Sequence, residues 1–110
     1  MNTHGTSTRL NDAAEAAALA RVFAGHSPPV TASKGVVGHA LGAAGAIEAT
    51  YTVLTLRHQL IPPTANFAHQ DGEHKIDIVA GAPRPARMTA AVSSSCGFGG
   101  QNAVLLFTLP

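Results

Sequence analysis

Charged residues are scarce in this sequence of 110 residues. Only 12% of them are Asp, Glu, Lys or Arg, which is about half of the usual share. A small domain has a high ratio of surface to volume and should carry more charge, not less. The shortage therefore predicts that much of the surface meets other protein, and that the isolated chain self-associates.

Thiols and strong charge asymmetry are also missing. The single cysteine, Cys96, excludes an internal disulfide and is compatible with a reducing cytoplasm. The formal net charge of +1 leaves no basic stripe for nucleic acid and no polybasic signal for a membrane. No signal peptide is recognised before the longest apolar stretch, and Glu48 in its middle argues against a membrane span. We expect a cytoplasmic protein without nucleic-acid or membrane partners.

The length predicts one domain at most, covering residues 1–110. A histidine-bearing motif stands at His4, immediately after the first residues, with no strand before it. We therefore expect a fragment of a longer protein with an added start codon.

A stretch rich in Gly and Ala dominates the middle of the chain. Residues 38–58 contain no proline, and Glu48 and Arg57 are their only formal charges. This pattern predicts one helix of about 20 residues. Small residues at helical spacing allow other backbone to approach on several sides, so we expect a central helix buried nearly all round. Glu48, His39 and the preceding Lys34 must then be paired or functional, because an unpaired buried charge is costly.

The remaining patterns predict a helix with Asp12 as its N-cap and Glu15 three residues on, ending near Gly25. They also predict a buried strand over 30–33, an edge strand over 76–79, strands over 89–95 and 102–109, and a tight turn over 96–100. We expect the last strand to be fully buried. This order of elements indicates an α/β fold with a mixed sheet. The histidines of the connectors are expected to be solvated, namely His26, His58, His69 and His74.

Three motifs occur in a fixed order, namely His4-Gly5-Thr6-Ser7-Thr8, then Lys34 with Gly38-His39-Ala40-Leu41-Gly42-Ala43-Ala44-Gly45-Ala46, then Gly97-Phe98-Gly99-Gly100-Gln101-Asn102. Together they resemble the C-terminal half of the β-ketoacyl-acyl-carrier-protein synthases, the condensing enzymes of fatty-acid and polyketide synthesis. The resemblance spans essentially the whole chain. It implies a thiolase-like α/β fold, in which two similar halves stack as five layers with one buried helix from each half in the middle.

The resemblance implies catalytic roles for His4 and His39. They are expected to hydrogen-bond the thioester carbonyl of a malonyl extender and to stabilise the enolate as carbon dioxide leaves. A neutral imidazole suits this role because it donates a hydrogen bond to developing negative charge. We place His39 in the first turn of the long helix, where the helix dipole favours the neutral ring. Lys34 resembles the family's catalytic lysine, with structural ion pairing as the alternative role. Glu48 resembles its buried supporting partner, which predicts a Lys34–Glu48 ion pair.

Gly97, Phe98, Gly99 and Gly100 resemble the glycine-rich gating loop of the family. The resemblance places Phe98 at the acyl pocket, with its backbone N–H helping to form an oxyanion hole. The glycines on both sides of Phe98 permit the positive φ values that such a loop needs. A core role for Phe98 is the less favoured interpretation.

Thr6 and Thr8 match threonines that line the family's phosphopantetheine channel. The resemblance implies no resident cofactor, because phosphopantetheine arrives on the carrier protein. Three residues depart from the family pattern: Cys96 stands where many relatives have Phe, Ser94 where many have Asn, and Arg9 where Pro is common. Cys96 is interpreted as a small buried hydrophobe rather than a nucleophile.

The family's nucleophilic cysteine belongs to the N-terminal half, so this chain alone is expected to be inert. The implied partners are that half, an acyl carrier protein, and a second subunit in a homodimer or heterodimer. A non-catalytic subunit of the chain-length-factor type is the alternative. No metal is expected, because His4, His39 and Cys96 lack the paired short spacing of zinc ligands.

Overall fold

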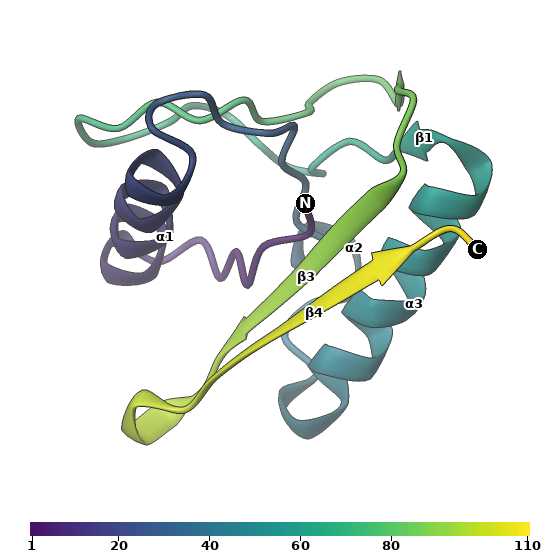
Figure 1. Cartoon of the computed structure of the whole chain (residues 1–110). Helices are drawn as coiled ribbons and strands as arrows, with labels where there is room; N and C mark the ends of the chain where they lie inside the picture. The colour runs from purple at the N-terminus through teal and green to yellow at the C-terminus, as the bar shows by residue number, and fades with distance from the viewer.

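The computed structural model describes residues 1–110 as a sheet with helices on both of its faces (Figure 1). The helices are α1 (Arg9–Val22), α2 (Lys34–Val37) and α3 (Ala44–His58), with short 3-10 turns at Leu41–Ala43 and Phe98–Gly100. The strands are β1 (Leu60–Ile61), β2 (Arg84–Pro85), β3 (Ala90–Cys96) and β4 (Asn102–Thr108). In Figure 1, α1 and α3 lie on opposite sides of the β3–β4 hairpin.

The sheet is mixed, as the order of elements predicts. Strands β3 and β4 pair antiparallel. Next to β3, Asn2 forms parallel bridges with both Ser93 and Thr31, and Val30 bridges Ile78 in the same sense. The predicted strands over 30–33 and 76–79 are thus present only as single bridges. A second small antiparallel sheet, β1–β2, was not predicted, because two-residue strands are too short to show an alternating pattern.

The long central helix is shorter than predicted. It begins at Ala44 rather than near Gly38, because two residues before it adopt left-handed backbone: φ is 70° at Gly38 and 49° at Leu41. A right-handed helix cannot pass through such residues. His39 therefore lies between α2 and the 3-10 turn, outside any helix.

Only one face of α3 is covered within this chain. Its buried residues recur every four positions, namely Ala44, Glu48, Thr52 and Leu56, and this spacing is that of a single helical stripe. Val53 and Leu54 on the other side are exposed. The expectation of a helix buried nearly all round is wrong for this chain, because the sheet covers one side only.

Strand β4 is also exposed where full burial was expected. The side chains of Val104 and Leu106 are each 66% exposed, because side chains stand out from the sheet and no element of this chain covers them. β4 is also the last strand of its sheet and pairs with β3 alone. An apolar strand at an open edge offers unpaired backbone groups and apolar side chains to another polypeptide. None of the helices combines the length and the hydropathy that a membrane crossing requires.

Candidate active site

The two histidines of the sequence motifs lie against each other. Their ring centroids are 5.3 Å apart, and the ring planes meet at 84° in an edge-to-face arrangement. His4 lies two residues after Asn2, which bridges Thr31 and Ser93, and it is only 8% exposed. His39 reaches the same place from the segment between α2 and α3, and its ring is on the surface of this chain.

Lys34 is buried at the N-terminal end of α2 and uses all of its donors on two residues. Its Nζ donates to the backbone oxygen of His4 at 2.6 Å, contacts Nδ1 of the same ring at 3.2 Å, and donates to Oε1 of Glu48. The side chains of Lys34 and Glu48 are 5% and 2% exposed. The predicted ion pair is therefore confirmed, and Lys34 joins it directly to His4.

The contact with Lys34 assigns the proton of the His4 ring. An ammonium group donates and does not accept, so Nδ1 of His4 is the acceptor and the proton lies on Nε2. Burial, and after it the positive charge of Lys34, lower the pKa of His4 below its usual value. The ring is thus held as a neutral donor, which is the form that the predicted role needs.

His39 is held in the same tautomer by different means. The backbone N–H of Leu41 donates to Nδ1 of His39 at 3.1 Å, which leaves the proton on Nε2. The turn at Ala40, with φ of −80° and ψ of 20°, brings this amide back toward the ring. The predicted stabilisation of the neutral ring by the first turn of a helix is wrong, because His39 precedes the helix.

Glu15 belongs to the site and was not predicted there. Its carboxylate accepts the backbone N–H groups of His4 and Gly5, both at 2.8 Å, and the side chain of Asn11 at 2.8 Å. The predicted role in capping is wrong, because α1 begins at Arg9 after Thr8 as N-cap. The sequence did contain a signal for the orientation of Glu15. Glu15 stands four residues before buried Leu19, and residues at this spacing lie on the same face of a helix.

Two serines of β3 reach carboxylates on opposite faces of the sheet. The Ser94 hydroxyl lies 3.4 Å from Oε1 of Glu15, and the Ser95 hydroxyl donates to Oε2 of Glu48 at 3.2 Å. Successive strand residues point to opposite faces, which explains this division. The sequence identified Ser94 only as a departure from a family pattern, and it gave no signal for Ser95.

The predicted gating loop is the turn between β3 and β4, and it projects from the body of the molecule (Figure 1). Phe98 is 99% exposed there, so its predicted place at an acyl pocket stays a prediction. Positive φ occurs after Phe98, at Gly99 (75°) and Gly100 (78°), whereas Gly97 has φ of −94°.

Cys96 is exposed rather than a buried hydrophobe, because it ends β3 at the base of this projecting turn. Desolvation of the sulfur, and after it the charge of Glu15, raise the pKa of the thiol. Since the thiolate is the nucleophilic form, this environment disfavours the reactive form of Cys96.

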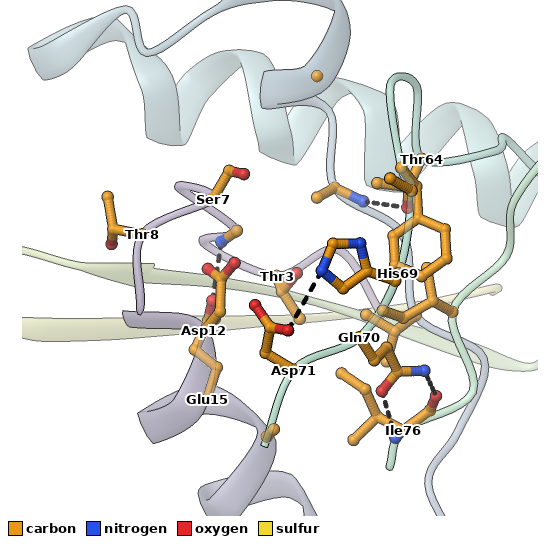
Figure 2. A pocket seen from close by; sticks show the side chains of 18 of the residues that line it. Thr3, Ser7, Thr8, Asp12, Glu15, Thr64, His69, Gln70, Asp71 and Ile76 are labelled. Carbon is orange, nitrogen blue, oxygen red and sulfur yellow. Dashed lines mark hydrogen bonds and ion pairs between the residues drawn. The ribbon is translucent and has the colours of Figure 1, made fainter. Parts of the chain in front are cut away.

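A cavity lies beside the histidine pair rather than at it. It measures about 680 Å³, and Thr8 lines it whereas Thr6, His4 and His39 do not. Figure 2 shows side chains of α1 and the preceding loop facing those of residues 64–76 across this space. The hydroxyls of Thr6 and Thr8 hydrogen-bond each other at 2.8 Å on the surface. Their predicted contact with phosphopantetheine stays a prediction.

The four connector histidines, His26, His58, His69 and His74, are exposed as predicted. One of them, His69, lies at the cavity and approaches Asp71 to 3.2 Å (Figure 2). Both side chains of this pair are largely exposed, so it adds little to stability.

Solved ketosynthases share this fold. The ishigamide ketosynthase/chain length factor superposes with a TM-score of 0.92 and 36% identity, covering 99% of this chain and 27% of the other. The ketosynthase of a type II polyketide synthase, solved in complex with its acyl-carrier protein, gives a TM-score of 0.90 and 30% identity over 97% of this chain and 27% of the other. The fold class is therefore thiolase-like α/β, as predicted.

Residues 1–68 match the family model of the β-ketoacyl synthase C-terminal domain. The 3-oxoacyl-[acyl-carrier-protein] synthase 2 of Mycobacterium tuberculosis is 45% identical over 107 residues, which cover 97% of this chain and 26% of that protein. The chain belongs to the β-ketoacyl synthase C-terminal domain family, which confirms the resemblance read from the three motifs. It spans about a quarter of the length of the relatives it matches.

Proposed function

We propose that this chain is the C-terminal part of a 3-oxoacyl-[acyl-carrier-protein] synthase that performs decarboxylative Claisen condensation. The observation that carries the proposal is the pair of imidazoles 5.3 Å apart, each with Nδ1 occupied by a separate contact. Both rings therefore keep an N–H at Nε2. Two such donors form a site for a developing oxyanion.

In the proposed reaction, the C–C bond to the carboxylate of a malonyl thioester breaks and carbon dioxide leaves. The electron pair of that bond forms an enolate, whose oxygen accepts hydrogen bonds from Nε2 of His4 and of His39. The enolate carbon then attacks an acyl thioester on a cysteine, and the cysteine thiolate is released as the new C–C bond forms. Lys34 and Glu48 act through His4, because the donors of Lys34 are already used.

The proposal includes partners that complete this site. The cysteine nucleophile would come from an N-terminal half, and the malonyl group would arrive on the phosphopantetheine arm of a carrier protein. Exposed apolar side chains support a docked half, namely Phe98, Leu41, Val36 and Val104. The gate formed by Gly97, Phe98, Gly99 and Gly100, the channel role of Thr6 and Thr8, a homodimer or heterodimer, and a cytoplasmic location belong to the same proposal.

The alternative is a non-catalytic subunit of the chain-length-factor type, since one structural relative is a ketosynthase/chain length factor. The occupied Nδ1 positions of His4 and His39 and the buried Lys34 favour the catalytic subunit, because a subunit without chemistry has no need of two oriented donors. Relatives named for both pathways match, so the proposal covers fatty-acid and polyketide substrates alike.

The test is a chimera in which residues 1–110 replace the matching segment of the mycobacterial synthase. We expect the chimera to release carbon dioxide from a malonyl thioester. His4→Ala and His39→Ala should each lower this release about 100-fold or more, as loss of one oxyanion donor does elsewhere. His74→Ala, which changes an exposed loop histidine, is the matched control and should leave the rate unchanged. Unchanged decarboxylation in either site variant would refute the assignment of that ring.

A further inference from the structure

Ser95 occupies a position from which it reaches the machinery around His4 without touching it. Its hydroxyl donates to Oε2 of Glu48 at 3.2 Å, while Oε1 of the same carboxylate accepts from Lys34. The Glu48 side chain is 2% exposed. Ser95 is therefore the side chain that satisfies the second oxygen of this buried carboxylate.

We propose that Ser95 is a positioning residue, which fixes the orientation of the Glu48 carboxylate so that Lys34 remains on Nδ1 of His4. That Ser95 orients Glu48 is inferred from the geometry alone. That this orientation matters for catalysis rests on the proposed function. Among the three contacts of the Lys34 ammonium, that with Nδ1 of His4 at 3.2 Å is the longest. It is the contact most easily lost when the carboxylate turns.

The charges that surround His4 come from every element packed against it. Lys34 on α2 lowers the pKa of His4, Glu15 on α1 and Glu48 on α3 raise it, and His39 lowers it. Without the Ser95 hydroxyl, Oε2 of Glu48 lacks a partner, and the ammonium of Lys34 moves to lie between both carboxylate oxygens. That movement takes positive charge away from the ring and frees Nδ1 to hold a proton.

Ser95 sits where the sheet register leaves little freedom. It pairs with Ala103 one step before the turn, and the Cys96–Asn102 pair closes the hairpin. Its neighbour Ser94 faces Glu15, whose carboxylate binds the backbone of His4 rather than the ring. Ser94→Ala is therefore a matched control, since it removes a hydroxyl from the same strand and leaves the Glu48 contact in place.

The experiment is nitrogen NMR of the histidine rings in the full 110-residue chain, recorded as a pH titration of the parent protein and of Ser95→Ala, Ser95→Thr and Ser94→Ala. In Ser95→Ala we expect the pKa of His4 to rise and the signature of an Nδ1 acceptor to be lost. Ser95→Thr retains a hydroxyl and should restore both, and Ser94→Ala should change neither. Ser95→Cys, which is nearly isosteric but a weaker donor, should shift both in part and replaces the alanine variant if that variant does not fold.

Two outcomes overturn the proposal: a folded Ser95→Ala or Ser95→Cys protein with unchanged His4 signals, or equal shifts in Ser94→Ala. The measurement involves no turnover. An inactive chimera would therefore refute the proposed function without affecting this result, and unchanged ring signals would refute the role of Ser95 without affecting the chimera.

Discussion

At the scale of single residues, the site depends on the pairing of every buried charge. Lys34 is paired with Glu48, and Glu15 is saturated by backbone and side-chain donors. His4, which lies among them, is the ring from which both burial and the nearest cation exclude a proton. Protonation of His4 should therefore change the free energy of unfolding, and so should the loss of either Lys34 or Glu48.

Acid should destabilise the protein through His4. Because the folded state lowers the pKa of His4 below the ordinary value of 6.5, the unfolded chain binds the proton first as the pH falls. The contribution of neutral His4 to the free energy of unfolding is then fully present above about pH 6.5. It decreases as the pH falls from there to the pKa of His4 in the folded state. Urea unfolding between about pH 5 and 8 measures this slope. His4→Gln should flatten it, whereas His74→Gln should not, and an unchanged slope in His4→Gln would contradict the argument.

The buried ion pair should be costly to break and cheaper to replace. Glu48→Ala leaves the Lys34 charge without its partner and should lower the free energy of unfolding by about 3–5 kcal/mol. The double variant Lys34→Met/Glu48→Leu removes both charges and should recover most of that loss. Denaturant unfolding measures both. Arg84→Ala, which removes the exposed pair with Asp77, is the control and should change stability little. A double variant no more stable than Glu48→Ala would contradict this account.

At the scale of elements, short segments place Lys34 and both histidines, while the long helices α1 and α3 supply the carboxylates of Glu15 and Glu48. The four-residue α2 carries Lys34, and the 3-10 turn carries the amide that holds His39. The loop after β1 supports α2, because the Asn66 side chain donates to the backbone oxygen of Gly35 at 2.9 Å. The positions of these segments depend on close backbone contacts, so they should be sensitive to a single added methyl group.

Gly35 should tolerate no side chain. A Cβ at this position would lie 2.3 Å from the backbone oxygen of Ala65, so Gly35→Ala must push α2 away from the loop. We expect a loss of about 1–3 kcal/mol in the free energy of unfolding, typical of overpacking. Gly42→Ala is the matched control, since nothing lies within 4 Å of its Cβ position. Thermal unfolding compares the two, and equal stability would show that the contact is not tight.

At the scale of the whole molecule, several apolar faces of this chain are not covered by other parts of the chain. The sheet covers one side of α3, β4 forms an open edge, and the hairpin turn carries a bare phenylalanine. Exposed apolar side chains on several elements are typical of a protein that binds other protein. The low share of charged residues is explained at this scale, since the missing charge corresponds to faces that another polypeptide would cover.

Self-association of the isolated chain should proceed through β4. Val104 and Leu106 are two positions apart, so their exposed side chains share one face of the strand. Val104→Lys/Leu106→Lys should shift the protein toward monomer, as charge on an edge strand does in natural sheets. Sedimentation at increasing concentration measures this. Val22→Lys, which changes an exposed residue at the end of α1, should have no effect. A parent chain that stays monomeric at high concentration would contradict the expectation.

The sequence by itself determined the α/β class, the family, the nearness of His4 and His39, and the partner of Lys34. The class follows from the order of elements and the pairing of Lys34 from its burial, because a buried ion in an apolar sequence requires a partner whatever the exact fold. The family and the nearness of the two histidines follow from the resemblance that the three motifs carry. The tertiary structure alone decided that Glu15 and Ser95 hold the site, that a backbone amide orients His39, and that β4 is open. Periodicity shows that an element has an apolar face, but only the assembled chain shows what covers that face and which donor reaches a given acceptor.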